Sequence, residues 1–200
     1  MAVSKTRAKL VDVARQLFAK QGVDNTTMND IAVASTKGRR TLYTYFKSKE
    51  EIYMAVVESE LDRLSEALEK VAAENIAPDV KILKLIETHL DAIKLIVRRN
   101  GTLRASFFRD IWRVERVRRK FNLREIALFK QVLIEGNNKG IFEVDNVDVL
   151  ADILHYCVKG IEVPYVRGKI GGELVGERKG WEYVAKIVYG ALGHKGNINS

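Results

Sequence analysis

Hydrophobic residues near the N-terminus follow the spacing of one helical face. They recur at intervals of one, three and four residues, at Leu10, Val13, Ala14, Leu17 and Phe18. This spacing predicts a first amphipathic helix. Ser4 is a suitable N-cap for it, and Gly22 is suited to a left-handed C-terminal end. We therefore expect one helix between Ser4 and Gly22.

Two short helices are predicted next. The hydroxyl of Thr27 suits the N-cap of a helix that carries Ile31 inward. The sequence Ser-Thr-Lys-Gly over residues 35–38 then breaks the pattern. A second short helix follows, because Leu42 and Phe46 are four residues apart and share a face. Three helices within about 45 residues predict a small, self-contained unit.

Longer helices are predicted from Ser48 onward. Ser48 and Glu51 have the spacing of a capping box, which predicts a strong helix start. Hydrophobic residues keep helical spacing in four stretches: residues 52–71, 83–97, 147–161 and 181–192. Between them we expect a break at 75–79, a short aromatic segment at 102–114, a helix over 116–138, and a glycine-rich loop at 168–176. Only Ile141–Val144 resembles a strand, so the predicted fold class is all-α.

The charge of the chain is concentrated near its N-terminus. The net charge is +8, and residues 1–50 hold ten Lys or Arg against four acids, a net of +6. A basic face on a small segment is expected of a protein that binds the phosphate backbone, although a solvated lysine-rich surface has the same composition. The single cysteine, Cys157, excludes an intrachain disulfide. With no long apolar stretch and no signal peptide, we expect a cytoplasmic protein without a membrane partner.

The second short helix has the side chains needed to read DNA. Its outward residues include Arg39, Arg40, Thr41, Tyr43 and Thr44. Arginine suits a bidentate contact with guanine, and threonine bonds a base edge or touches a thymine methyl group. Donors near the end of the helix would hold phosphates without reading sequence. The predicted DNA-binding residues are therefore Thr27, Lys37, Arg39, Arg40, Thr41, Tyr43, Thr44, Tyr45, Lys47 and Lys49.

A family resemblance strengthens this prediction. The run Leu-Tyr-Thr-Tyr-Phe-Lys-Ser-Lys-Glu over residues 42–50, with the preceding helices, resembles the N-terminal domain of TetR-family regulators. The resemblance implies that Tyr43 and Lys49 clamp phosphates and that the start of the third helix, from Arg39, reads bases. The chain departs from the family at Thr36, where a small residue or glycine is usual, and at Gly38, where Ser or Thr is usual.

The resemblance also implies the organisation of the whole chain. Residues 1–50 are expected to form a helix-turn-helix DNA-binding domain, and residues 51–200 a helical ligand-binding and dimerisation domain. The stripes at 147–161 and 181–192 suit a four-helix dimer interface on a palindromic operator, although ordinary core packing would produce the same stripes. A repressor that responds to a small-molecule effector is the expected function.

An effector pocket is harder to place from sequence. Aromatic and polar residues that could line one are Phe107, Phe108, Trp112, His155 and Tyr156, and packed core is the alternative reading. Arginines recur between residues 98 and 124. They could receive an anionic ligand, but a solvated, salt-bridged face explains them too.

Other classes of function fit the sequence less well. His155 and Cys157 are two residues apart, so they point to different sides of a helix and cannot form a nucleophile–base pair. We predict no catalytic residues, no metal site and no cofactor. A helical protein-interaction module without sequence-specific DNA binding is the remaining alternative. A steep loss of DNA binding with rising salt would separate the regulator from it.

Overall fold

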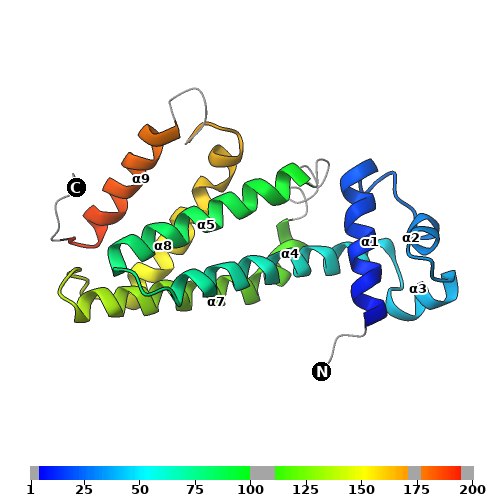
Figure 1. Ribbon diagram of the computed structural model, residues 1–200, viewed down its shortest axis with the longest axis horizontal. Coiled ribbons are helices and arrows are strands. Elements are labelled where there is room, and N and C mark those ends of the chain that lie inside the picture. The colour runs from blue at the N-terminus through cyan, green and yellow to red at the C-terminus, as the bar shows by residue number, and fades with distance from the viewer. Residues whose placement is uncertain (1–4, 100–110, 171–176, 195–200) are drawn as a thin grey trace. The chain divides into compact units, whose positions relative to one another are not determined.

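Every element of regular structure described in the chain is an α-helix. The computed structural model describes residues 5–99, 111–170 and 177–194 (Figure 1). Its helices are α1 (Lys5–Gln21), α2 (Met28–Ala34), α3 (Arg39–Tyr45), α4 (Lys49–Ala72), α5 (Pro78–Arg99), α7 (Ile111–Asn138), α8 (Val147–Val166) and α9 (Glu177–Ala191). The predicted all-α class is confirmed. Ile141–Val144 does not form a strand.

The chain divides into two compact units. Unit 1 comprises residues 1–63 and 95–120, and unit 2 comprises residues 64–94 and 121–200. Helices α1, α2 and α3 therefore lie wholly in unit 1, whereas α8 and α9 lie wholly in unit 2.

Unit 1 is built on the first hydrophobic stripe. Leu10, Ala14 and Phe18 are fully buried on α1, as the spacing predicts. Gly22 follows α1 with φ 90°, the left-handed conformation expected of it. The Phe18 ring packs edge-on against Tyr53 of α4, with ring centroids 6.2 Å apart. Burial of this stripe is what holds a surface helix such as α1 in place.

The start of α4 is capped, with one change from the expected pattern. The Glu51 amide donates to the Ser48 hydroxyl at 3.2 Å. The Glu51 carboxylate, however, accepts from the amide of Lys47 at 2.6 Å, one residue before the position that a standard capping box uses. The hydroxyl half of the predicted capping box is therefore present, whereas the carboxylate of Glu51 accepts from the residue before the N-cap instead of from Ser48.

Unit 2 has its own hydrophobic core. The core residues that α5, α7 and α8 contribute include Ile82, Leu85, Ile86, Leu90, Phe129, Val132, Leu133, Ala151, Leu154 and Val158. Pro78 begins α5, where its missing N–H costs nothing because the first helical N–H groups have no partner within the helix. The buried Lys81 of α5 pairs with Glu135 of α7 at 2.9 Å.

One sequence prediction about the later helices is wrong. Residues 111–114 belong to α7 rather than to a separate segment, because no Gly or Pro interrupts the chain between Ile111 and Glu135. The expected short segment otherwise falls on residues 100–110, which lie outside the described residues.

The stripes expected at the dimer interface are only partly buried within unit 2. Among the predicted stripe residues, Leu154 on α8, Val188 on α9 and Leu192 just beyond α9 are buried, whereas Cys157 on α8 is exposed. A different face of each helix exposes apolar side chains. On α8 these are Val149, Ile153 and Tyr156, exposed by 52%, 50% and 64%, and on α9 they are Tyr183 and Ile187, exposed by 67% and 72%. Spacing alone located one stripe per helix and could not reveal a second apolar face.

None of the helices in the described ranges combines the length and the apolar character that crossing a bilayer requires.

Candidate DNA-binding surface

Thr27 and Asp30 fix the start of α2. The Asp30 amide donates to the Thr27 hydroxyl at 3.1 Å, and the Thr27 amide donates to the Asp30 carboxylate at 2.8 Å. These two contacts form a complete capping box. Hydrogen bonds from the Thr27 backbone and then its side chain lower the pKa of Asp30, which keeps the carboxylate ionised as the cap requires. Thr27 thus has a structural task besides its predicted contact with DNA.

The turn between α2 and α3 has an unusual backbone. Thr36 has φ 58°, and among the described residues it is the one non-glycine with a positive φ. Glycine adopts this conformation without a steric cost, and a small residue or glycine is usual there in the family that the sequence resembles. The turn is held by the buried Ser35, whose hydroxyl donates to the Ala32 carbonyl at 3.0 Å, and by Lys9 of α1, whose ammonium donates to the Thr36 hydroxyl at 3.3 Å.

Helix α3 begins where the sequence predicts. Gly38 is its N-cap, in an extended conformation and without a side-chain hydrogen bond. Leu42 and Phe46 are buried, with exposed fractions of 0% and 2%. The Arg7 guanidinium lies 5.2 Å from the centroid of the Phe46 ring, a cation–π distance. One face of α3 is thereby fixed to the unit and the other faces solvent.

The outward face of α3 carries the predicted base-reading side chains. Arg39, Arg40 and Thr44 are exposed, Tyr43 is 43% exposed, and Thr41 is partly buried. The Thr44 hydroxyl donates to the Arg40 carbonyl at 2.9 Å, so its oxygen remains available as an acceptor. The two arginines keep the planar, five-donor groups suited to guanine edges or phosphates.

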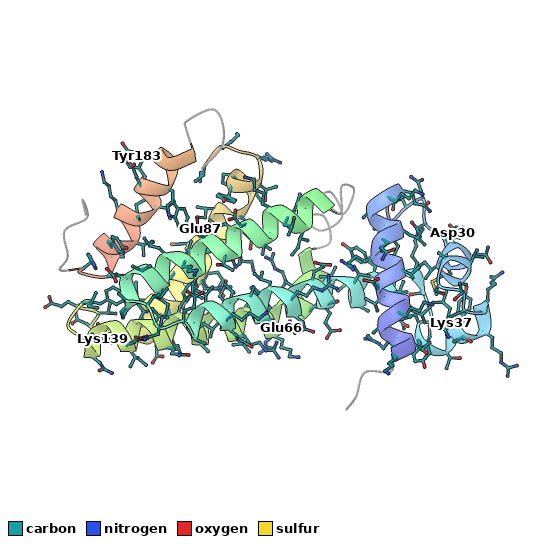
Figure 2. All side chains as sticks on the ribbon, viewed as in Figure 1. Asp30, Lys37, Glu66, Glu87, Lys139 and Tyr183 are labelled. Carbon is teal, nitrogen blue, oxygen red and sulfur yellow. The ribbon has the colours of Figure 1, made fainter. Side chains whose placement is uncertain are left out.

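Basic side chains flank this face. Lys37 lies in the turn before α3 and is partly exposed, and Figure 2 labels it together with Asp30 of α2. Lys47, just after α3, is exposed. Tyr45 is partly buried. Lys37 and Lys47 are free to approach a phosphate without disturbing the packing of α3.

Lys49 is placed differently from the other lysines. Its ammonium donates to the carbonyls of Val23 and Asp24, at 2.8 and 3.3 Å. An ammonium has three donors, so one remains for a phosphate. The side chain therefore also fixes the loop between α1 and α2. Sequence reasoning missed this role, since no spacing links residue 49 to a loop 25 residues earlier.

The predicted effector residues are only partly within the described structure. Phe107 and Phe108 lie outside the described residues, and so does the side chain of Trp112. His155 is 1% exposed, whereas its neighbour Tyr156 is 64% exposed. Their rings meet edge-on, with centroids 5.1 Å apart. The two residues thus share an edge contact, but only His155 faces the interior of unit 2.

His155 belongs to a buried polar cluster that the sequence did not reveal. His89 of α5 bonds Glu125 of α7 through Nδ1 at 2.5 Å and Glu162 of α8 through Nε2 at 3.0 Å. Nδ1 of His155 bonds the second oxygen of Glu125 at 2.6 Å. We call His89, Glu125, His155 and Glu162 the His–Glu cluster. Its members come from three helices, which explains why sequence spacing gave no sign of it.

Charge pairing within the His–Glu cluster outweighs the cost of burial. Burial would lower the pKa of His89, but the charge of Glu125 and hydrogen bonds to Glu125 and Glu162 raise it to about 9. Burial would likewise raise the pKa of Glu125, but the His89 charge and bonds from both histidines lower it to about 2. Within the described part of the chain, no three His, Cys, Asp or Glu side chains are arranged to hold a metal ion.

Comparison with known proteins identifies the N-terminal helices. Residues 10–56 match the sequence model of the family described as bacterial regulatory proteins, tetR family. The chain is 27% identical over 197 residues to the HTH-type transcriptional repressor KstR2 of Mycolicibacterium smegmatis, covering 96% of this chain and 93% of that protein. It is 24% identical over 156 residues to the HTH-type transcriptional regulator QacR of Staphylococcus aureus, covering 76% and 82%.

Solved structures share the fold over almost the whole chain. SmeT, the repressor of the Stenotrophomonas maltophilia multidrug efflux pump SmeDEF, aligns with a TM-score of 0.69 at 18% identity, covering 98% of this chain and 94% of SmeT. A transcriptional regulator from Cytophaga hutchinsonii aligns with a TM-score of 0.68 at 21% identity, covering 92% and 93%. The family match over residues 10–56 and these relatives identify the first helices as a TetR-family helix-turn-helix domain, and the chain is a DNA-binding transcriptional regulator.

Proposed function

We propose that this regulator is a repressor that binds a palindromic operator as a homodimer and releases it when a small-molecule effector binds. One observation carries the DNA-binding part of the proposal. Helix α3 is fixed by the buried Leu42 and Phe46 while Arg39 and Arg40 remain exposed on its other face. A helix held in this way can enter a major groove without losing its packing.

The proposed roles follow from exposure and chemistry. Residues 1–50 act as the DNA-binding domain, in which Arg39, Arg40 and Thr41 read bases, with Thr44 as an acceptor beside them. Contacts to phosphates come from Thr27, Lys37, Tyr43, Tyr45, Lys47 and Lys49. Lys49 contributes one donor, because its other two hold the α1–α2 loop. The proposed site of action is the cytoplasm.

The proposed dimer joins α8 and α9 to the same helices of a second copy. Supporting this, Val149, Ile153 and Tyr156 on α8 and Tyr183 and Ile187 on α9 are at least half exposed. Contiguous exposed apolar residues are typical of protein interfaces. Each helix also has a glycine, Gly160 or Gly190, with no atom within 4 Å of a Cβ built there. A small residue at such a position allows a partner helix to approach closely.

The effector part of the proposal draws on the relatives. KstR2 and SmeT are both named repressors, and SmeT has been solved as a complex with triclosan. Residues 51–200 are proposed as the corresponding ligand-binding and dimerisation domain. An effector releases DNA only if it binds more tightly to a conformer that fits the operator poorly. DNA and effector must then weaken each other's binding by the same factor.

Selection of bound fragments from random duplex DNA tests the proposal. We expect a palindromic consensus, because a two-fold dimer presents two identical helices. Affinity for the selected duplex should fall steeply with salt, since Lys and Arg contacts release counterions from phosphates. Recovery of no consensus, with equal affinity for competitor DNA, would favour the alternative of a helical protein-interaction module. Existing observations do not favour that alternative.

A further inference from the structure

Thr36, in the turn between α2 and α3, combines a strained backbone with an exposed side chain. Its φ of 58° lies in the left-handed region, where a β-branched residue is a clear outlier. The amide of Thr36 donates to the Val33 carbonyl at 3.0 Å, and the next amide donates to the Ala32 carbonyl at 3.2 Å. Backbone hydrogen bonds thus close the turn whatever side chain stands at position 36. The presence of a threonine there requires a separate explanation.

The Thr36 hydroxyl holds Lys9 of α1. This hydroxyl donates to the Ser35 carbonyl at 2.6 Å and accepts from the Lys9 ammonium at 3.3 Å. Its one hydrogen is used in the first contact, so toward Lys9 it acts as an acceptor. Glycine at position 36 would relieve the backbone but would leave Lys9 without this contact. The strained threonine therefore has one visible consequence, which is the placement of a lysine.

Lys9 keeps both charge and donors for a further contact. The residue is exposed. Within the described ranges its ammonium makes one hydrogen bond, to Thr36, and pairs with no carboxylate. An ammonium has three donors, so two remain. A lysine held at one place with its charge not neutralised is suited to a phosphate, which an ammonium binds as a point charge.

We propose that Lys9 is an additional contact to a DNA phosphate and that the Thr36 hydroxyl positions it. This inference rests on the proposed entry of α3 into the major groove, because the turn ends at Gly38, the N-cap of α3. Lys37, which Figure 2 labels, follows Thr36 directly, so this turn bears two cations. Cations beside a helix that enters the groove meet the flanking backbone and fix the register of the protein on the duplex.

The salt dependence of DNA binding by the full-length protein tests the proposal. Each phosphate contact releases counterions, so removing one lowers the slope of log affinity against log salt by about one. A dimer carries two copies of Lys9, and we expect Lys9→Ala to lower the slope by about two. Affinity at about 0.1 M salt should fall about tenfold. Lys9→Arg keeps the cation and should retain the wild-type slope.

Two comparisons make the change in slope specific. The selected operator and an unrelated duplex should show the same loss, since phosphates are common to all sequences. Lys20→Ala is the matched control, because Lys20 is also exposed on α1 but lies about three turns further along the helix. This variant removes the same charge and should leave the slope nearly unchanged. A general effect of net charge would lower both slopes equally.

Substitutions at Thr36 separate positioning from stability. Thr36→Gly removes the hydroxyl and the strain together, so its thermal unfolding midpoint should equal or exceed that of wild type. Its affinity for DNA should nevertheless fall about threefold, because Lys9 loses its fixed position. Thr36→Ser keeps the hydroxyl and should retain the wild-type affinity. In the Thr36→Gly background, Lys9→Ala should cost less affinity than it does in wild type.

Three results would overturn the inference. A wild-type slope for Lys9→Ala, or equal losses for Lys9→Ala and Lys20→Ala, would remove Lys9 from the phosphate contacts. Loss of stability together with affinity in Thr36→Gly would mean that Thr36 only supports the turn. Slopes on an unrelated duplex do not depend on operator selectivity. Failure of the proposed repressor function would therefore appear as the absence of a palindromic consensus, with these slopes unaffected.

Discussion

Single side chains on α3 divide into those that hold the helix and those that face solvent. Leu42 and Phe46 are buried. Truncating either side chain would destabilise the packing of α3 rather than remove a contact with DNA. Arg40 and Lys47 are exposed and can be changed without loss of core packing. They are therefore the positions where DNA recognition can be tested separately from stability.

Arg40→Ala should relax sequence discrimination. If Arg40 pairs with a guanine edge, its loss should cost about 1–3 kcal/mol at one operator position. The measurement is affinity for the selected operator and for each single-base variant. Lys47→Ala is the matched control and should weaken binding to all these duplexes alike. A uniform loss for Arg40→Ala would remove this residue from the base-reading set.

Gly136 is a second position where one residue decides the packing. A Cβ at this site would overlap the ring of Phe142, which packs against the last turn of α7. Gly136→Ala should lower the free energy of unfolding by about 1–3 kcal/mol, as overpacked cores do. Chemical denaturation gives the value. In a Phe142→Ala background the extra cost should largely vanish, and an undiminished cost there would show that the ring is not its cause.

Among the helices, the features that lie within a single helix could be predicted from the sequence. The C-terminal end of α1 follows from Gly22, and the start of α3 follows from Gly38. The buried faces follow from three- and four-residue spacing. The start of α7 was missed because the aromatic segment predicted at 102–114 contains no Gly or Pro that would separate it from the helix. Contacts between helices were also missed. The contact of Lys49 with the α1–α2 loop joins segments far apart in sequence, and so does the His–Glu cluster. No local pattern therefore marks either of them.

The exposed faces of α8 and α9 lead to a prediction about assembly. Ile187→Asp would place a charge in the proposed helix–helix contact, where its desolvation is costly. We expect a monomer by light scattering at micromolar concentration and loss of most operator affinity, since a single half-site remains. Leu123→Asp is a fair control because Leu123 on α7 is also exposed, by 63%. Equal dimer dissociation in the two variants, or in neither, would contradict the assigned interface.

For the whole molecule, the His–Glu cluster makes stability depend on pH at two ends. The pKa of His89 is raised in the folded protein, so its contribution is complete below pH 6.5 and is lost as pH rises toward about 9. The pKa of Glu125 is lowered, so its contribution is complete above pH 4.5 and is lost as pH falls toward about 2. Stability should therefore be greatest between these two windows.

Substitution of His89 isolates the alkaline limb. We expect wild-type protein to lose unfolding free energy between pH 6.5 and about 9, and His89→Gln to lose distinctly less over that range. Thermal or urea unfolding at a series of pH values measures both curves. His194→Gln, which removes a histidine outside the His–Glu cluster, is the control. Parallel curves for wild type and His89→Gln would mean that His89 is not charged in the folded state.

The proposed DNA binding depends most on two α3 helices held at a fixed separation by one dimer. The direct measurement is affinity for the selected operator before and after about five base pairs are inserted between its half-sites, which turns them to opposite faces of the duplex. We predict that affinity falls to the level of unrelated DNA, with the protein still dimeric. Unchanged affinity for the lengthened operator would contradict a fixed separation of the two α3 helices.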